Sequence, residues 1–382
     1  MTLNKHIKNI PLQKASHPFF SSGPCIKPPF WNINFLKNSI LGRSHRSNKG
    51  IEQIKKTIQL TKQIFNIPDN YHIALIPGGG TGAMESALWS LLGSKPIDVL
   101  SWDIFGRRWK EDIEQQLKPE KIFFHDAIFG KIPNLNQVNF NNDIVFTWNG
   151  TTTGVCIPGG KWIPNNRSGL TICDAVSAIG AFNLPWTKLD ATAFSWQKGL
   201  GGEGEHGMLV LSPRSIERLN TDLPKWPIPF NLNLREKRKV NANLFKGETL
   251  NTPSLLCIED WIQCLNWAKR IGGLSKLLKR VKKNYRLLNI WVKNQSWIDF
   301  LVKDKSIRSP VSVCLKLVNI KGWSTVYHIA KIMEENKTGF DIINHKFSSP
   351  CFRIWIGPTV ESEDLVNMLT WFKWSYKRVV NK

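Results

Sequence analysis

The feature that most constrains the fold of this 382-residue chain is a regular alternation of short apolar segments with helical stretches up to about residue 211. Apolar residues recur at helical spacing at 50–65 and 83–92, which indicates helices with one buried face. Short apolar runs bounded by turn residues predict strands at 71–77, 97–101, 121–124, 143–148, 169–173, 193–196 and 207–211. Strands that alternate with helices form a mostly parallel, doubly wound sheet, so the sequence predicts an α/β fold.

The chain is long enough to divide into a major and a minor domain. After residue 252 the pattern changes to a long apolar helix, a basic helix, two strands and a final helix, which predicts a smaller α+β domain. We expect helices at 255–271, 274–297 and 363–380 and strands at 311–317 and 351–356. The expected division is an N-terminal arm at 1–16, a large domain at 17–268 and a small C-terminal domain at 269–382.

The composition is that of an ordinary globular protein, with 42% hydrophobic residues. No stretch approaches the roughly 20 uninterrupted apolar residues of a membrane span. The first residues lack the apolar core of a signal peptide, so the expected location is the cytoplasm. The seven cysteines are scattered without CxxC pairs, which predicts reduced thiols and neither a disulfide framework nor a metal site.

The net charge of +23 raises the question of a nucleic-acid partner, because basic surfaces bind phosphate backbones. The lysines and arginines are spread along the chain, however, and no nucleic-acid-binding motif accompanies them. A basic surface around sites for anionic small molecules explains the charge better. We therefore expect no specific nucleic-acid partner and no membrane partner, although non-specific affinity at low salt would follow from the charge.

Two residues at the predicted carboxyl ends of strands could carry chemistry. Asp174 closes the apolar run at 169–173, and Lys198 follows the strand at 193–196 and precedes several glycines. A lysine that reacts with an aldehyde must be a neutral amine, which burial favours. A carboxylate at Asp174 could keep a cofactor's pyridinium nitrogen protonated, as pyridoxal phosphate requires. Alone, the two residues are explained as well by a solvated loop lysine and a helix cap.

A glycine run at 78–82 lies between a predicted strand and a predicted helix. Backbone N–H groups and the helix dipole converge there on one point, which suits a phosphate group. Gly80 and Thr81 are the natural contacts. The spacing fits neither a Walker loop nor a dinucleotide fingerprint, and a purely structural turn is the alternative.

Aromatic and hydroxyl side chains follow two other strands. Phe105 is the first candidate, and Trp109 the second, to lie flat on a cofactor ring, although either could simply belong to the core. Thr151 could donate a hydrogen bond to the phenolic oxygen of such a ring, with a plain turn as the alternative. The sequence leaves open which of the two aromatics stacks on the cofactor.

Six motifs, taken in their order along the chain, resemble the successive motifs of the phosphoserine aminotransferase family, within the class V (fold type I) pyridoxal phosphate aminotransferases. They lie at 20–24, 44–47, 78–82, 174–178, 196–199 and 250–253. Each is weak alone, but the ordered series is specific. The resemblance implies a fold type I aminotransferase, with a large domain built on a mostly parallel sheet and a smaller C-terminal domain.

The resemblance also implies residue roles around the cofactor. Lys198 resembles the Schiff-base lysine and Asp174 the partner of the pyridinium nitrogen. Gln197, together with Gly80 and Thr81, resembles the contacts to the cofactor phosphate.

Further implied residues bind substrate or come from a second subunit. Asn251 and Thr252 resemble residues that reach the cofactor phosphate from the neighbouring subunit, which implies a homodimer. His45 and Arg46 resemble the pair that binds the substrate phosphate, and Arg353 resembles the arginine that binds the substrate α-carboxylate. A guanidinium group, which can donate two parallel hydrogen bonds, suits both anions.

The implied reaction is the ping-pong transfer of an amino group from glutamate to 3-phosphohydroxypyruvate, which yields 2-oxoglutarate and O-phosphoserine in serine biosynthesis. Activity on 4-phosphohydroxythreonine, for pyridoxine biosynthesis, is a further possibility. Two departures place the chain in a divergent branch: Thr81 stands where many members have arginine, and the residues after Lys198 are unusual.

Three alternatives remain at the level of sequence. The first is another class V aminotransferase, such as one of the alanine–glyoxylate type. The second is a cysteine desulfurase, which is disfavoured because Cys314 and Cys351 lie in apolar strand patterns rather than on a mobile loop. The third is a basic nucleic-acid-binding protein on an inactive scaffold, against which the combination of Lys198, Asp174 and Gln197 argues.

Overall fold

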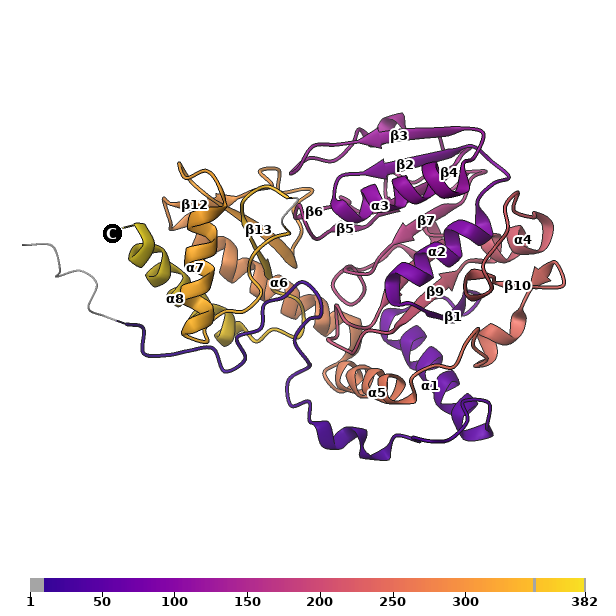
Figure 1. The fold of residues 1–382 in the computed structure, drawn as a ribbon, viewed down its shortest axis with the longest axis horizontal. Coiled ribbons are helices and arrows are strands. Elements are labelled where there is room, and N and C mark those ends of the chain that lie inside the picture. Colours follow the sequence, from indigo (N-terminus) through magenta and orange to yellow (C-terminus); the bar gives the residue numbers. More distant parts are fainter. Residues whose placement is uncertain (1–9, 346–347, 381–382) are drawn as a thin grey trace, which may run out of the picture.

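A seven-stranded sheet forms the centre of the large domain in the computed structural model, which describes residues 10–345 and 348–380 (Figure 1). The strand order is β1-β9-β8-β7-β4-β2-β3. The strands are β1 (His72–Pro77), β2 (Ile97–Ser101), β3 (Ile122–Asp126), β4 (Asp143–Thr147), β7 (Thr171–Asp174), β8 (Ala191–Ser195) and β9 (His206–Leu211). Only β9 among them runs antiparallel to its neighbours, β1 and β8. The predicted α/β class with a mostly parallel sheet is confirmed.

Helices cover both faces of this sheet. They are α1 (Asn48–Phe65) and α5 (Leu255–Arg270) on one face, and α2 (Gly79–Leu91), α3 (Ile104–Asp112) and α4 (Pro213–Thr221) on the other. Helix α1 begins at the cap residue Ser47, whose hydroxyl accepts a hydrogen bond from the backbone of Gly50, and ends at Asn66 in a left-handed conformation. Its apolar face places Ile54 and Phe65 in the same core cluster as Phe194 of β8.

The small domain contains a three-stranded antiparallel sheet in the order β12-β13-β14. Its elements are α6 (Gly273–Lys293), β12 (Ile298–Phe300), β13 (Ser312–Leu317), α7 (Trp323–Glu335), β14 (Phe352–Trp355) and α8 (Ser362–Val380). Helix α6 joins the two cores, because Leu277 near its start packs in the large-domain core and Leu288 near its end packs in the small-domain core.

We propose, as the sequence predicts, a domain boundary close to residue 268, where α5 ends and α6 begins. Within the proposed large domain at 17–268, the first residues also contact the small domain. Phe20 and Cys25 pack in the small-domain core, and the backbone N–H of Trp355 donates to the carbonyl of Phe20 at 3.0 Å. Of the predicted N-terminal arm at 1–16, residues 1–9 lie outside the described residues.

The predicted helices and central strands match the structure to within a few residues. The largest differences are at α2, which begins four residues before the predicted start at 83, and at α6, which ends four residues before the predicted limit of 297. No helix was predicted at 104–112, 213–221 or 323–335, where α3, α4 and α7 lie. The remaining short elements are η1 (Ile33–Asn38), η2 (Ile113–Leu117), η3 (Leu135–Gln137), β5 (Asn149–Gly150), β6 (Val155–Cys156), η4 (Trp186–Lys188), η5 (Phe230–Leu232), β10 (Arg235–Glu236), β11 (Lys239–Val240) and η6 (Ala242–Lys246). Elements of two to six residues carry too little periodicity to be predicted from sequence.

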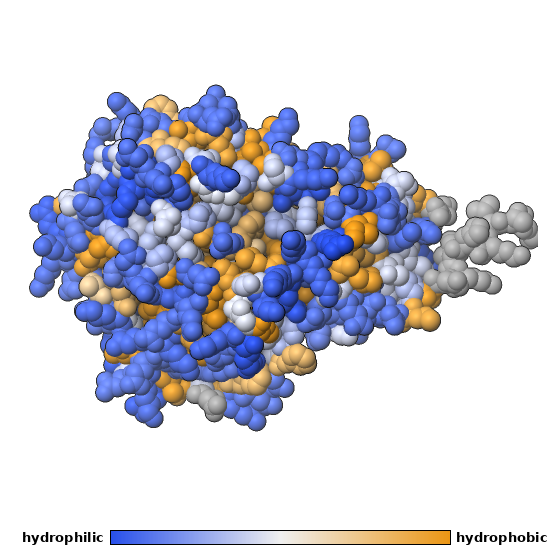
Figure 2. Space-filling view, turned by 180° about the vertical axis from the view of Figure 1, so that it is seen from behind, coloured by the Kyte–Doolittle hydropathy of each residue, from blue (hydrophilic) through white to orange (hydrophobic). Residues whose placement is uncertain are grey.

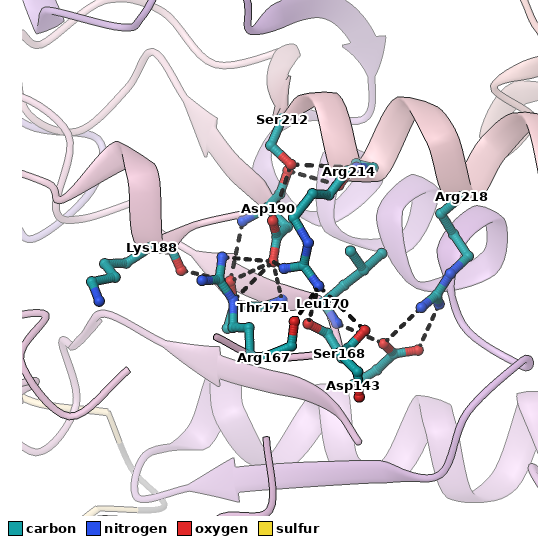
Figure 3. Close-up of polar contacts among 12 residues, drawn as sticks. Asp143, Arg167, Ser168, Leu170, Thr171, Lys188, Asp190, Ser212, Arg214 and Arg218 are labelled. Carbon is teal, nitrogen blue, oxygen red and sulfur yellow. Dashed lines mark hydrogen bonds and ion pairs between the residues drawn. The ribbon is translucent and has the colours of Figure 1, made fainter. Parts of the chain in front are cut away.

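Buried ion pairs hold the amino-terminal end of the sheet (Figure 3). Asp143, the first residue of β4, accepts hydrogen bonds from Arg218 at 2.8 and 3.2 Å and from the backbone N–H of Leu170 at 2.8 Å. Asp190, which immediately precedes β8, pairs with Arg167 at 3.0 Å and with Arg214 at 2.8 Å. These contacts satisfy carboxylates that would otherwise be costly to bury.

Figure 2 shows hydrophilic side chains over most of one face, with apolar side chains in separate patches. Within residues 10–345 and 348–380, no helix is both long enough and apolar enough to cross a membrane.

Candidate active site

A cavity of about 530 Å³ lies at the carboxyl-terminal edge of the central sheet. Parallel strands deliver the residues that follow them to this one edge, which is where ligands bind in open α/β sheets. Eight residues that the sequence analysis singled out line the cavity: Gly80, Thr81, Phe105, Trp109, Thr151, Asp174, Gln197 and Lys198. They come from distant parts of the chain and are brought together by the order of the strands.

Lys198 follows β8, and its side-chain amine donates a hydrogen bond to the backbone carbonyl of Ser22. Burial lowers the pKa of Lys198, and the positive charge of Arg353 lowers it further, while Cys25 and nearby carboxylates oppose the shift. The segment that passes over the lysine needs glycine at position 23, where φ is +146° and a Cβ atom would collide with the amine. The site therefore favours the neutral, nucleophilic amine.

Asp174 ends β7 and is almost completely buried. One of its carboxylate oxygens accepts a hydrogen bond from the backbone N–H of Val176 at 3.0 Å, and the other accepts one from the indole Nε1 of Trp109 at 2.9 Å. Burial raises the pKa of Asp174, while these two hydrogen bonds and the charge of Lys198 lower it. A cationic ligand group beside this carboxylate would stabilise its ionised form.

The glycine run opens the N-terminus of α2 towards the cavity. Gly78 and Gly79 have positive φ angles of 80° and 64°, which a side chain would strain. Gly82 is needed for packing, because a Cβ atom there would overlap the carbonyl of Pro77. The run thus has a structural role, as the alternative interpretation proposed. The N–H of Gly79 donates to the carbonyl of Glu205 at 2.7 Å, and the next N–H groups of the first helical turn belong to Gly80 and exposed Thr81.

Several buried polar atoms around the cavity have no partner among the described residues. They include the Thr151 hydroxyl and Gln197 Oε1, both of which line the cavity, and the hydroxyl of Ser195 at the end of β8. Unsatisfied buried polar groups are rare in proteins, and where they gather they indicate that a polar ligand completes the hydrogen bonds. The donors and acceptors present fit a planar, phosphorylated cofactor.

The two candidate stacking residues differ in their surroundings. Both line the cavity, but Phe105 is partly exposed, whereas Trp109 is 2% exposed and donates its indole N–H to Asp174. This hydrogen bond favours Phe105 as the residue that packs against a flat ring.

Five predicted residues do not line this cavity in the part of the chain that the structure describes: His45, Arg46, Asn251, Thr252 and Arg353. Arg353 on β14 is nonetheless near enough to lower the pKa of both Lys198 and Cys25, and its Nε atom is buried without a partner. His45 and Arg46 immediately precede α1, and Asn251 and Thr252 precede α5.

Further polar residues lie at or near the site, although no individual role was predicted for them from the sequence. Asn149 and Ser177 line the cavity and share a hydrogen bond of 2.9 Å. Asp103 is 1% exposed, caps α3 through a 2.8 Å hydrogen bond from Gly106 N–H, and has a pKa raised by burial to about 7. An aspartate two residues beyond a predicted strand is a helix-cap signal, so Asp103 could have been noticed.

Within the described residues, no three or more His, Cys, Asp or Glu side chains are arranged to hold a metal ion. All seven cysteines are free thiols, and six of them are buried.

Comparison with known structures identifies the class of protein. The phosphoserine aminotransferase of Cytophaga hutchinsonii is 22% identical, and the alignment has a TM-score of 0.80 and covers 93% of this chain and 98% of that one. A pyridoxal phosphate-bound phosphoserine aminotransferase of Trichomonas vaginalis is 16% identical, with a TM-score of 0.75 and coverage of 93% and 99%. The fold is therefore that of a fold type I pyridoxal phosphate aminotransferase.

Comparison of sequences identifies the family within that class. No family model matches the chain. A phosphoserine aminotransferase of Methanosarcina barkeri is 45% identical over 369 residues, which cover 97% of this chain and 99% of that protein. The chain belongs to the phosphoserine aminotransferase family. The predicted fold type, enzyme class and cofactor are confirmed.

Proposed function

We propose that this protein transfers the amino group of glutamate to 3-phosphohydroxypyruvate and so forms O-phosphoserine for serine biosynthesis. The observation that carries the proposal is the convergence of Lys198 and Asp174 on one cavity of a chain that is 45% identical to a phosphoserine aminotransferase. Activity on the longer substrate 4-phosphohydroxythreonine, for pyridoxine biosynthesis, is part of the same proposal.

The residues around the cavity fit pyridoxal phosphate, which when bound supplies an electron sink that acidifies the Cα–H bond of an amino acid. Lys198 would hold the cofactor and then move a proton to and from Cα as a neutral amine. Asp174 would keep the ring nitrogen protonated. Gln197, with Gly80 and Thr81 at the start of α2, would hold the phosphate.

Two further residues would orient the ring. Phe105 would pack against one face of it, and the unpartnered hydroxyl of Thr151 would donate to its phenolic oxygen. Both contacts fix the plane of the cofactor relative to Lys198, and such positioning accelerates proton transfer.

A phosphorylated amino acid carries two anionic groups that need separate cationic anchors. Arg353 is proposed to bind the α-carboxylate, because its charge already acts on Lys198 and its Nε atom lacks a partner. His45 and exposed Arg46 are proposed to bind the substrate phosphate. Burial and the charge of Arg46 lower the pKa of His45, so at neutral pH the imidazole would act as a neutral donor and Arg46 would supply the charge.

We also propose a homodimer. His45, Arg46, Asn251 and Thr252 do not line the cavity of their own chain, as far as the structure describes it, so a second copy would bring them to the site. The seven free thiols favour a reducing compartment, which supports a cytoplasmic enzyme.

Mixing two inactive variants tests the contribution across subunits. Lys198→Ala and Arg46→Ala each should lose activity, but a mixed dimer contains one site with native Lys198 and native Arg46. Unfolding and refolding an equal mixture should therefore restore about a quarter of the wild-type activity, from half the dimers with one site each. No recovery, with mixed dimers demonstrated, would place Arg46 in its own subunit's site or outside the site.

The first experiment is to record the visible spectrum of the purified protein and add glutamate, O-phosphoserine, alanine and cysteine separately. Loss of the cofactor band with glutamate and O-phosphoserine alone would support the proposal. Loss with alanine instead would indicate an aminotransferase of the alanine–glyoxylate type. Reaction with cysteine would indicate a desulfurase, which the 2% and 0% exposures of Cys314 and Cys351 disfavour.

A further inference from the structure

The indole N–H of Trp109 donates a hydrogen bond to Asp174. In the proposed function, Asp174 is the residue that binds the ring nitrogen of the cofactor. Trp109 lies on α3, which begins immediately after β2 and is capped by Asp103. The cap fixes the start of the helix, and Trp109 packs on the sheet in the same cluster as Val145 and Ile172. Trp109 is thereby held by both the helix and the core, with its Nε1 atom 2.9 Å from Asp174 Oδ2.

The two oxygens of Asp174 are held by two different N–H groups. The backbone of Val176 donates to Oδ1 at 3.0 Å, and Trp109 donates to Oδ2 at 2.9 Å. Because each oxygen has one donor, the two hydrogen bonds restrain rotation of the Asp174 carboxylate about χ2. Each oxygen retains a second lone pair, so a ligand can still approach.

We propose that Trp109 is a positioning residue that orients the Asp174 carboxylate and stabilises its ionised form. This role differs from stacking on the cofactor ring, and it rests on the proposed function only through the assignment of Asp174. Hydrogen bonds to an ionised group are stronger than those between neutral groups. Without the indole N–H, the Asp174 carboxylate would be more basic. It would then compete more strongly with the cofactor's ring nitrogen for the proton that the nitrogen must keep.

The electrostatic surroundings of Asp174 set the expected direction of the pH effect. Among titratable groups, Lys198 lowers the pKa of Asp174, and the charge of Asp174 in turn raises the pKa of Asp103 and of the Cys173 thiol. Burial raises the pKa of Asp174, whereas the Trp109 hydrogen bond lowers it. Removal of that hydrogen bond should therefore raise the pKa and move the acidic limb of the pH profile to higher pH.

Trp109→Phe separates this role from stacking, because phenylalanine keeps an aromatic ring and loses only the N–H donor and part of the volume. We expect pyridoxal phosphate to bind the cofactor-free variant about 10- to 100-fold more weakly. In the reloaded enzyme we expect kcat to fall more than the KM for glutamate rises, with the acidic limb shifted upwards. Unchanged cofactor affinity and an unchanged pH profile would overturn the proposal.

Trp186→Phe is the matched control. Trp186 is also buried, and its Nε1 donates at 2.9 Å to the carbonyl of Phe65, on the other side of the large domain. Both substitutions remove one indole hydrogen bond and similar volume, so both should lower the free energy of unfolding. Only Trp109→Phe should change cofactor affinity and the pH profile. Equal effects of the two variants would show a merely structural role and overturn the proposal.

A measurement on the cofactor-free protein covers the case in which Trp109→Phe does not fold. With ¹⁵N-labelled indoles, the Nε1–H resonance of Trp109 should respond to Asp174→Asn, whereas that of Trp186 should not. The absence of any indole response would overturn the proposal. If the wild-type protein reacts with neither glutamate nor O-phosphoserine, the proposed function fails, whereas the NMR and binding results on Trp109 still stand.

Discussion

The two ends of the central sheet differ in how their buried charged side chains are paired. At the amino-terminal end, Asp143 and Asp190 are 0% and 1% exposed, and arginines and N–H or O–H donors surround both (Figure 3). At the carboxyl-terminal end, Asp103, Asp174 and Lys198 lie together, and no arginine of the described part of the chain forms an ion pair with either carboxylate. The first end is internally satisfied, whereas the second has buried polar atoms, such as Asp103 Oδ2 and the Thr151 hydroxyl, that lack a hydrogen-bond partner among the described residues.

This difference separates charges that hold the fold from charges that perform chemistry. A fully paired buried carboxylate has no free capacity to bind a ligand, and its loss leaves its partners unsatisfied. A carboxylate or amine with a shifted pKa and spare hydrogen-bonding capacity can exchange protons with a substrate. We expect substitutions at the amino-terminal end to affect stability and those at the carboxyl-terminal end to affect activity.

The largest expected effect is at Lys198. Lys198→Ala should reduce transamination at least a thousandfold, because it removes the amine that moves the proton. The fold should persist, since the change removes a buried amine rather than a packed core group. Steady-state activity and circular dichroism measure the two effects. Substantial residual transamination would refute the assignment of Lys198.

Arg218→Met tests the opposite end of the sheet. Arg218 pairs with fully buried Asp143 at 2.8 Å, so its removal leaves a carboxylate without its cation. We expect the free energy of unfolding to fall by about 3–5 kcal/mol. The specific activity of the folded, cofactor-loaded variant should stay within about twofold of wild type. Denaturant titrations and activity assays on the same samples check this, and a selective loss of activity would break the comparison.

Asp103→Asn tests the unsatisfied end through pH. Burial raises the pKa of Asp103 to about 7, so the native state keeps its proton while the unfolded state releases it near pH 4. The stability contributed by the protonated form is therefore complete below pH 4 and is lost as the pH rises to 7.

Asparagine has no such titration and can still accept the capping hydrogen bond from Gly106. Between pH 5 and pH 8, the stability of cofactor-free Asp103→Asn relative to wild type should rise by roughly 2–3 kcal/mol. Urea unfolding at the two pH values measures this difference. A constant difference would mean that Asp103 titrates in the normal range.

The smallest effect is expected at a solvated pair that belongs to neither end. Arg280 and Glu361 are 2.9 Å apart, with side-chain exposures of 28% and 44%. Glu361→Gln should change the free energy of unfolding by less than about 1 kcal/mol. The effect should shrink further in high salt, because exposed ion pairs are screened. An effect as large as that of Arg218→Met would show that burial does not account for the difference between these pairs.

The predictable part of the fold rests on long periodic patterns. Helices such as α1 and α8 were predicted because their apolar residues recur at helical spacing over many turns. Strands such as β2 were predicted because they are short apolar runs bounded by turn residues. The packing of Phe20 and Cys25 into the small-domain core was not predicted, because contacts between residues hundreds of positions apart leave no local pattern.

The candidate site was predictable where motifs lie at the ends of strands. Lys198, Asp174 and the glycine run could be placed together because parallel strands end at one edge. Asp103 carries only a helix-cap signal and Asn149 only a turn signal, and neither signal indicates that the side chain lies at a ligand site. Trp109 was placed near the cofactor, but its hydrogen bond to Asp174 depends on how α3 packs on the sheet.

The sequence by itself determined the class of fold, the order of the motifs and the residue types available for the chemistry. These depend on local periodicity and on spacing along the chain, which the sequence contains directly. Only the tertiary structure decided which charges are satisfied and which are left for a ligand, and that Trp109 donates to Asp174. Hydrogen bonding and desolvation act over a few ångströms, and the folded chain alone sets those distances.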